Sequence, residues 1–473
     1  MSPEVLQPGR GPAPAKRPWE EKPKRARPPR EGRGRSRTPI VVAGVLVLVL
    51  LGVGLALLLS QSSTTVVKPP TTPTTTPSSG GGGTTPGPGG LPTASETSPA
   101  NVPAAAPPPV STTPPAGAVT IGTGDNAERV VRAQPAGTSF VLASGVHDGF
   151  SVVPKTGDRF YGQPGAVLDG QGDTAVAFSS ITHQGMADNV AVLGASLSQQ
   201  LLIRNYNNHQ QEQLGTIQTN AGSQANGTKQ FAKGWDLQYV TITGSYSRGI
   251  TLSDDMTVAY CRVVGNDRLG IGGGGQGITI VHDVIDNNGV GVANRGSEAG
   301  GIKTTGRGVL IADNQINNNG APGVWTDVNA EAVRVLDNVI THNENGVHIE
   351  ISHNVQVTGN RIANNKKKAV LISASSQVTI TGNLIVNNQG GVVAGGVNRG
   401  HKSGPHPLTD VVVEGNVIIN SRTSGVTQKL PPSDTVKFDY NTFSGGGFVW
   451  NGHHVTFNQW QAQGQETHGK FLG

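Results

Sequence analysis

Residues 298–350 read EAGGIKTTGRGVLIADNQINNNGAPGVWTDVNAEAVRVLDNVITHNENGVHIE and contain three copies of one unit. Each copy begins with a small residue and an apolar residue and ends in an Asn-rich turn. When the copies are aligned, one column contains polar and aromatic residues of different chemistry: Lys303, Trp325 and His348. A second column, two residues further on, contains Thr305, Asp327 and Glu350. We use the repeated unit to predict the fold, and the two columns to predict a functional site.

The same unit recurs from about residue 235 towards the C-terminus, in segments such as VLIADNQI, VRVLDNVI and VQVTGNRI. Each segment places a polar residue or a cysteine at one position of the repeat, which is occupied by Cys261, Asp283, Asn314, Asn338, Asn360, Asn383, Asn416 and Asn441. The spacings are 22–25 residues, except for one of 31 and one of 33. A repeat of this length with three short strands and no helical periodicity predicts a solenoid of parallel β-strands.

The repeated asparagines are interpreted as scaffold. Amide side chains that stack about 4.8 Å apart can hydrogen-bond from one coil to the next, and Asn tolerates the left-handed backbone of tight turns. Cys261 occupies the same position, so we interpret it as a small packed residue and not as a nucleophile.

The composition fits a turn-rich β protein joined to low-complexity segments. The 473 residues include 67 Gly and 31 Pro, with 4% aromatic and 14% charged residues. The single cysteine excludes an intramolecular disulfide framework and a zinc site built from cysteines.

The net charge of +5 is unevenly distributed. Residues 1–38 contain 11 basic and 4 acidic residues, which leaves 25 basic and 27 acidic residues for the rest of the chain. The high isoelectric point therefore belongs to the N-terminal tail, and the folded part is not expected to bind nucleic acid.

The N-terminal quarter of the chain predicts three segments without a core. Residues 1–38 are basic and proline-rich and are expected to be a disordered cytoplasmic tail; a docking segment for anionic lipid or a partner, with Trp19 as anchor, is the alternative. Residues 39–60 contain 20 consecutive uncharged apolar residues, enough to span a bilayer as one helix. Residues 61–118 are rich in Thr, Pro, Ser and Gly and predict a semi-extended linker.

The basic residues before residues 39–60 place the N-terminus in the cytoplasm by the positive-inside rule. A cleaved signal peptide is the alternative, but the apolar run is longer than a usual signal core, which favours an uncleaved anchor. We therefore expect a single-pass protein of the cell membrane whose folded domain, residues 119–473, is extracellular.

A short helix is expected at the start of this domain. Asp125 is the predicted N-cap of a helix that carries Val130 and Val131, and a strand follows over Ser139–Ala143. Such a helix would cover the open end of the first coil, where strand edges are otherwise unpaired.

Three groups of residues resemble a known family: FVLASGVHDGFSVVPKTGDRFYGQPGAVLDG at residues 140–170, the repeated G-N-x-I turns with the run EAGGIK…GVWTD…GVHIEIS, and NQWQAQGQETHG at residues 458–469. Together they resemble the right-handed parallel β-helix of the pectate-lyase-like superfamily, over about residues 120–473. The resemblance implies an all-β solenoid. It does not imply one reaction, because lyases, hydrolases, epimerases and adhesins share this fold. The Tyr-plus-His motif of alginate epimerases and the calcium-aspartate cluster with catalytic Arg of pectate lyases were not found.

Strand alternation predicts which side chains face outward. In GVHIEIS, Val347, Ile349 and Ile351 are expected inside the solenoid, and His348, Glu350 and Ser352 outside. The same alternation directs five residues of three adjacent coils to one outer sheet face: Lys303, Trp325, Asp327, His348 and Glu350.

These residues are the candidate catalytic site. Asp327 and Glu350 on neighbouring strands could act as an acid/base pair, because two close carboxylates raise each other's proton affinity. Lys303 could act as a base or bind a uronate carboxylate, and His348 could transfer a proton. Trp325 offers a flat face for a sugar ring. The two carboxylates could also bind Ca²⁺, although two are few for this ion, and no metal site is predicted. A solvated polar surface without function is the other alternative.

The two long spacings add loops beside this face. About eight extra residues precede Lys303 and include Arg295 and Glu298, which are predicted to contact substrate; about ten follow Gly395 and include His401 and His406, which we interpret as loop residues. We expect a membrane-anchored extracellular protein that binds a polysaccharide or cell-envelope glycan and degrades it as a hydrolase or a lyase. The alternative is a non-catalytic surface β-helix that binds envelope glycan or a protein partner.

Overall fold

The computed structural model describes residues 110–182, 185–207, 214–223, 229–290, 298–395, 408–431 and 434–473. The predicted tail, the predicted membrane segment and the linker up to residue 109 lie outside these residues, as do Arg295, His401 and His406. Within the described ranges, no helix is both long enough and apolar enough to cross a bilayer.

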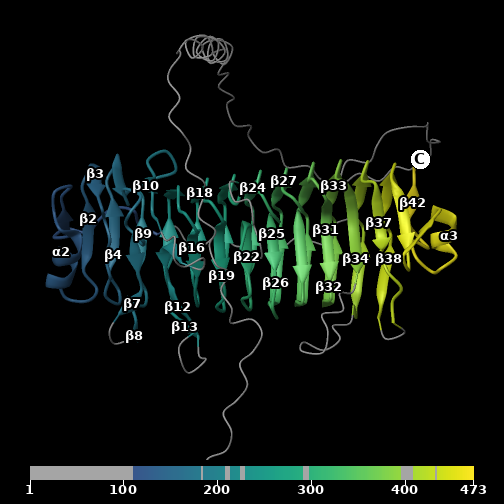
Figure 1. Cartoon of the computed structure of the whole chain (residues 1–473), viewed down its shortest axis with the longest axis horizontal. Coiled ribbons are helices and arrows are strands. Elements are labelled where there is room, and N and C mark those ends of the chain that lie inside the picture. The colour runs from purple at the N-terminus through teal and green to yellow at the C-terminus, as the bar shows by residue number, and fades with distance from the viewer. Residues whose placement is uncertain are drawn as a thin grey trace, which may run out of the picture. The chain divides into compact units, whose positions relative to one another are not determined.

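The described chain forms a parallel β-helix in which successive coils stack along one axis (Figure 1). Each regular coil contributes one strand to each of three sheets, named A, B and C in the order in which the chain visits them. The neighbouring strands within each sheet pair in parallel, apart from the last pair of sheet C, β40 and β41, which is antiparallel.

Sheet A contains 13 strands: β1 Val119–Ile121, β2 Ser139–Leu142, β4 Arg159–Gly162, β9 Ala191–Leu193, β14 Asp236–Gln238, β17 Thr257–Ala259, β20 Thr279–Val281, β23 Leu310–Ala312, β26 Glu331–Leu336, β29 His353–Thr358, β32 Ser376–Thr381, β35 Val411–Glu414 and β38 Val436–Asp439. Sheet B contains 13 strands: β3 Gly145–Asp148, β5 Ala166–Asp169, β10 Leu201–Arg204, β15 Val240–Thr243, β18 Arg262–Val264, β21 Val284–Asp286, β24 Gln315–Asn317, β27 Val339–Thr341, β30 Arg361–Ala363, β33 Leu384–Val386, β36 Val417–Ile419, β39 Thr442–Ser444 and β42 Lys470–Phe471.

Sheet C contains 12 strands: β6 Phe178–Ser179, β11 Gly215–Gln218, β16 Arg248–Leu252, β19 Leu269–Gly273, β22 Gly300–Thr304, β25 Val324–Thr326, β28 Val347–Glu350, β31 Lys368–Ser373, β34 Gly390–Gly395, β37 Thr423–Val426, β40 Gly447–Trp450 and β41 His453–Val455. Four short strands form two antiparallel hairpins beside the coils: β7 Ile181–Thr182 with β8 Gly185–Met186, and β12 Asn220–Ser223 with β13 Lys229–Phe231.

A short helix is present at the N-terminal end, α2 Ala127–Ala133, as the sequence predicted. Its N-cap is Asn126, whose side chain accepts a hydrogen bond from the Arg129 amide at 2.8 Å. The prediction of Asp125 as N-cap was wrong by one residue, because the Asp125 carboxylate instead accepts a hydrogen bond from the Gly122 amide and closes the preceding turn. Val131 is fully buried, so the helix covers the first coil.

A second helix, α3 Phe457–Gln461, closes the C-terminal end. A capping box between Thr456 and Gln459 begins it. Trp460 of this helix is fully buried and packs against Phe438, Phe443 and Phe448 of the last coils. Both ends of the apolar core are therefore covered, which protects the unpaired strand edges.

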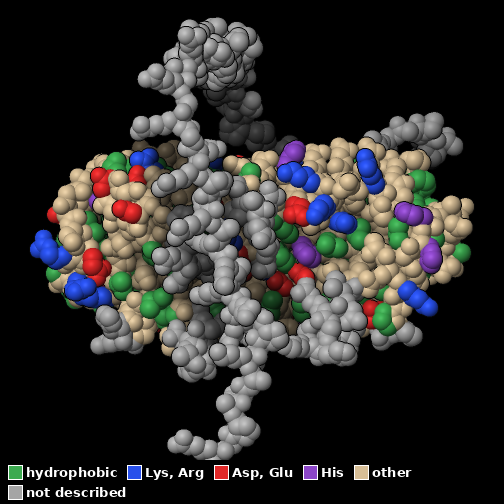
Figure 2. Space-filling model, viewed as in Figure 1, with side chains coloured by type: hydrophobic (Ala, Val, Ile, Leu, Met, Phe, Trp, Pro, Cys, Tyr) green, Lys and Arg blue, Asp and Glu red, His purple; other side chains and the backbone are tan. Residues whose placement is uncertain are grey.

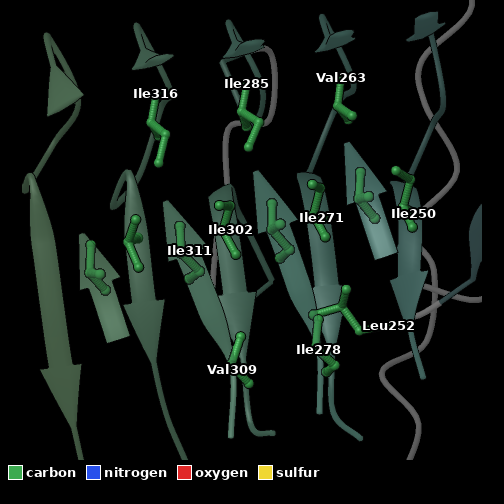
Figure 3. Close-up of a cluster of buried hydrophobic side chains, with 14 of the residues drawn as sticks. Ile250, Leu252, Val263, Ile271, Ile278, Ile285, Ile302, Val309, Ile311 and Ile316 are labelled. Atoms are coloured by element: carbon green, nitrogen blue, oxygen red, sulfur yellow. The ribbon is translucent and has the colours of Figure 1, made fainter. Parts of the chain in front are cut away.

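Stacks of aliphatic side chains fill the interior of the coils. In sheet C, Ile250, Ile271 and Ile302 lie in register on adjacent strands and are fully buried. Figure 3 shows this stack together with Val263, Ile285 and Ile316 of sheet B. Each coil alone would leave its apolar face in water, so the coils stabilise one another by stacking.

The predicted asparagine ladder is confirmed as scaffold. The side-chain oxygen of each member accepts a hydrogen bond from the backbone amide of the preceding member, from Cys261 to Asn441. The ladder ends at Glu466, whose carboxyl group accepts from the backbone and the side chain of Asn441. Burial raises the pKa of the Cys261 thiol, which fits a packed residue.

A second ladder, which the sequence analysis did not separate from the first, follows the sheet B strands. Its members are Asn266, Asn288, Asn319, Asn343, Asn365, Asn388 and Ser421. The two ladders enclose the short strands of sheet B from both sides and fix the register of both turns.

The last part of the predicted linker contacts the domain. Val110 packs against Tyr161, Ala191 and Leu193, and the Thr112 hydroxyl donates a hydrogen bond to the Ala195 carbonyl at 3.0 Å. Two residues of the predicted linker, Val110 and Thr112, therefore contact the β-helix.

Asp283 occupies a ladder position that is an asparagine in the following coils. We predict that its carboxyl group makes the ladder less stable than an amide would. Burial raises the pKa of Asp283 well above its usual range, and its Oδ2 atom is buried without a hydrogen-bond partner among the described residues. The equivalent Asn314 amide donates to the Ile280 carbonyl and to Asn338. Asp283→Asn should therefore raise the free energy of unfolding at pH 7 by about 1–3 kcal/mol, measured by urea denaturation.

The pH dependence gives the sign of this effect. Because the pKa of Asp283 is raised in the folded protein, its protonated carboxyl stabilises the fold fully only below the unfolded pKa of about 4. As the pH rises from there towards the folded pKa, this contribution to the free energy of unfolding is lost. The gain from Asp283→Asn should thus grow between pH 4 and pH 8. Asp313→Asn, at an exposed turn position beside the ladder, is the matched control and should show little change. A loss of stability in Asp283→Asn at pH 8 would contradict this explanation.

Candidate functional site

The first predicted column lies in register on three adjacent strands of sheet C. Lys303 of β22 pairs with Trp325 of β25, which pairs with His348 of β28. The same row continues to Gly272 on one side and to Leu371 and Val393 on the other. The polar and aromatic part of the row is therefore confined to three coils and is bordered by a glycine and by aliphatic residues.

Trp325 is held between its two neighbours in this row. The Lys303 ammonium lies 4.0 Å from the centre of the indole ring, and the His348 imidazole stacks on the ring with a centroid distance of 5.3 Å and an interplanar angle of 18°. Because these residues come from the strands on either side, the indole is enclosed by a cation–π contact and a stacking contact. A sugar ring would have to displace one neighbour or use the indole edge, so the expected open platform is not what this geometry presents.

The Glu350 carboxylate joins the second column to the first. Trp325 Nε1 donates a hydrogen bond to Glu350 Oε2 at 3.0 Å, and the same oxygen lies 4.0 Å from His348 Nε2. The side chains of His348 and Glu350 are 14% and 11% exposed. Glu350 thus accepts a hydrogen bond from an indole N–H and lies near an imidazole, beyond direct hydrogen-bond distance.

Asp327 has a different partner. Its Oδ2 atom lies 2.9 Å from Lys303 Nζ, and both side chains are 8% exposed. Its Oδ1 atom accepts a hydrogen bond from the Val328 amide at 2.8 Å. The two candidate carboxylates are therefore engaged by different groups, a division that the spacing of the residues alone did not predict.

The predicted alternation breaks after Glu350. Ile351, expected inside, is partly exposed, and Ser352, expected outside, is buried with its hydroxyl donating to the Glu350 carbonyl at 2.8 Å. The reason is local: Ile351 has a φ of +46°, which ends the extended strand and turns the chain towards sheet A.

Glu298 lies at the neighbouring edge of this face and forms an ion pair with Arg248 of β16. Arg248 was missed by the sequence analysis, because it stands outside the residues 298–350 that define the two columns. Its side chain is 8% exposed, and its Nε atom is buried without a hydrogen-bond acceptor among the described residues. At Gly272, a Cβ atom would lie 2.8 Å from Leu269 Cδ1 and 3.4 Å from the Arg248 side chain, so the glycine mainly makes room for the leucine.

The charges on the visible face are mixed. In Figure 2, acidic, basic and histidine side chains are scattered among neutral and hydrophobic ones, without one continuous basic area. Within the described ranges, no group of three or more His, Cys, Asp and Glu residues is arranged to hold a metal ion.

The similarity to known proteins concerns the fold. A family model described as "Right handed beta helix region" matches residues 221–385. The A-module of the mannuronan C-5 epimerase AlgE6 of Azotobacter vinelandii superposes with a TM-score of 0.53 at 15% identity, covering 73% of this chain and 92% of that module. The catalytic unit of the GH87 α-1,3-glucanase of Streptomyces thermodiastaticus strain HF3-3 gives a TM-score of 0.49 at 15% identity, covering 72% of this chain and 65% of the glucanase chain.

PfbA, a surface adhesin of Streptococcus pneumoniae, gives a TM-score of 0.41 at 14% identity, covering 69% of this chain and 84% of the adhesin. No curated protein matches the chain by sequence. The three parallel sheets and the matching family model agree on the architecture. The described chain folds as a right-handed parallel β-helix.

Proposed function

We propose that the outer face of sheet C over β22, β25 and β28 binds a polysaccharide and catalyses its cleavage. One observation carries the proposal: five residues with acid, base, cation and aromatic chemistry, from three consecutive coils, contact one another at the positions described above. The neighbouring coils have Gly272, Leu371 and Val393 in the same row. A solvated surface needs no such local concentration, since isolated surface ion pairs stabilise a fold very little.

Glu350 is the best candidate for proton transfer. Its carboxylate accepts from the indole N–H of Trp325 and lies 4.0 Å from His348 Nε2. Through one bridging water, the imidazole would take up or return the proton that Glu350 exchanges with substrate. Both hydrolysis and β-elimination of a glycan need such a base and an acid.

Asp327 and Lys303 are assigned complementary roles. The ion pair between them is largely buried, which fixes the Lys303 ammonium in place. In this position the ammonium can stabilise negative charge that develops on the substrate. Asp327 would orient Lys303 for this role.

A non-catalytic binding surface is the second candidate. It is favoured by the engagement of both carboxylates, because Asp327 pairs with Lys303 and Glu350 accepts a hydrogen bond from Trp325. The fold does not choose between the two, since one fold serves enzymes and binding proteins alike.

Glu350→Gln should lower turnover at least about a hundredfold and leave polysaccharide binding in place, because the amide keeps the shape and loses the proton exchange. The full-length protein is incubated with a panel of polysaccharides. New reducing ends without ultraviolet absorbance indicate hydrolysis, and an absorbing unsaturated product indicates elimination.

Glu331→Gln is the matched control, since Glu331 lies on sheet A and pairs with the exposed Arg307. Turnover by Glu350→Gln at the wild-type rate would contradict the proposed catalytic site. Binding of a polysaccharide by the wild-type protein, with no product of any kind, would support the non-catalytic candidate.

We also propose that residues 39–60 anchor the protein in the cell membrane with the β-helix outside. The support is the uncharged apolar run and the basic residues before it. The full chain should remain in the membrane fraction after alkaline extraction, and a chain that begins at residue 61 should not.

Orientation can be measured by labelling introduced cysteines with a membrane-impermeant maleimide. Ser198→Cys, at an exposed position of the β-helix, should react in intact cells, and Ser36→Cys should react only after lysis. The buried native Cys261 contributes little background. The reverse pattern of labelling would show that the topology is inverted.

A further inference from the structure

A surface cavity of about 370 Å³ lies over the C-terminal strands of the same sheet, β34, β37, β40 and β41. It is lined by Lys367, Lys368, Gln389, Gly390, Val393, Thr423, Thr427, Val449, Gly452 and His454. The lining contains two lysines and one histidine and no acidic residue. None of these residues belongs to the site proposed above.

Two glycines create the hollow. Val393, Gly425 and Val449 lie in register on adjacent strands, so the middle of the apolar floor has no side chain. Gly425 has a φ of +122°, and a Cβ atom there would collide with the Val449 carbonyl, so other residues are excluded. At the rim, a Cβ on Gly390 would lie 3.2 Å from Lys368 Cγ, so this glycine makes room for the lysine stem.

The two lysines of the cavity differ in their partners. Lys367 forms an ion pair with Glu344. The Lys368 side chain is half-buried and its ammonium makes no hydrogen bond or ion pair with a described residue; its backbone amide donates to Asn345. A half-buried cation beside Thr423, Gln389 and His454 can bind an anionic group with both charge and hydrogen bonds.

The cavity lies on the same sheet as the candidate site. His348, Leu371 and Val393 are in register on β28, β31 and β34. The cavity floor therefore begins two strands, or about 10 Å, from His348, and an aliphatic side chain lies between them. A chain of sugars that runs along the axis of the β-helix would reach both places.

We propose that this cavity is a subsite for the anionic group of an acidic polysaccharide, with Lys368 as the residue that binds the carboxylate. This inference rests on the proposed function in one respect, namely that the polysaccharide runs along the axis of the β-helix from the candidate site to the cavity. The cavity can bind an acidic oligosaccharide whether or not the neighbouring site is catalytic. Leu371 and Val393 would contact the apolar faces of the intervening sugars.

The test compares oligogalacturonate with the same oligosaccharide after methyl esterification of its carboxyl groups, by calorimetry on the full-length protein. Lys368→Gln should weaken binding of the acid form about tenfold or more and leave binding of the ester unchanged, because one charge-assisted hydrogen bond is lost. A sulfated oligosaccharide as a third ligand shows whether the anion must be a carboxylate.

Lys366→Gln is the matched control, since Lys366 belongs to the same run of three lysines, is exposed and does not line the cavity. It should change the affinity less than twofold. Equal losses in Lys366→Gln and Lys368→Gln would overturn the subsite, because they would show attraction by surface charge alone.

The outcomes separate this inference from the proposed function. Unchanged affinity in Lys368→Gln, together with lost turnover in Glu350→Gln, would overturn the subsite and keep the catalytic site. Weakened affinity for the acid form alone, in a protein without turnover, would keep the subsite and remove the catalytic proposal. Acidic oligosaccharides too short to reach from the cavity to His348 should still respond to Lys368→Gln.

Discussion

Hydrogen bonding from one coil to the next is the interaction on which the rest of the structure depends. The two amide ladders hold the turns on either side of sheet B, from Cys261 to Asn441 and from Asn266 to Ser421. They are buried, so an amide that lost its partner would carry the full cost of desolvation. The ladders thus oppose any slip of one coil against the next, which would send the apolar side chains to the wrong face.

This fixed register is what makes a site possible on a flat sheet. Residues about one repeat apart in sequence become neighbours at the spacing of β-strands, so Lys303, Trp325 and His348 stack although 22 and 23 residues separate them. The same register brings Val393, Gly425 and Val449 together and leaves a hollow where the glycine stands. Both proposed binding features therefore arise where the residues at an aligned position of the repeat differ from those in the neighbouring coils.

Several features of the site could be predicted from the sequence, and others could not. The row and its outward direction follow from the period of the repeat and from strand alternation. The pairing of Asp327 with Lys303, the pairing of Glu350 with Trp325, and the enclosure of the indole depend on side-chain rotamers, which no spacing specifies. Arg248 pairs with Glu298 although the two residues come from different coils, a contact that neither residue predicts alone.

The sequence by itself determined the solenoid, its period, its buried amide ladder and the coils on which the repeat is specialised, because these depend on local pattern and on the identity of residues at repeated positions. Only the tertiary structure decided which charged groups pair, how far each side chain is buried, where alternation breaks at Ile351 and where a hollow opens at Gly425. Those properties arise between coils, from side chains and backbone angles that a linear pattern does not contain.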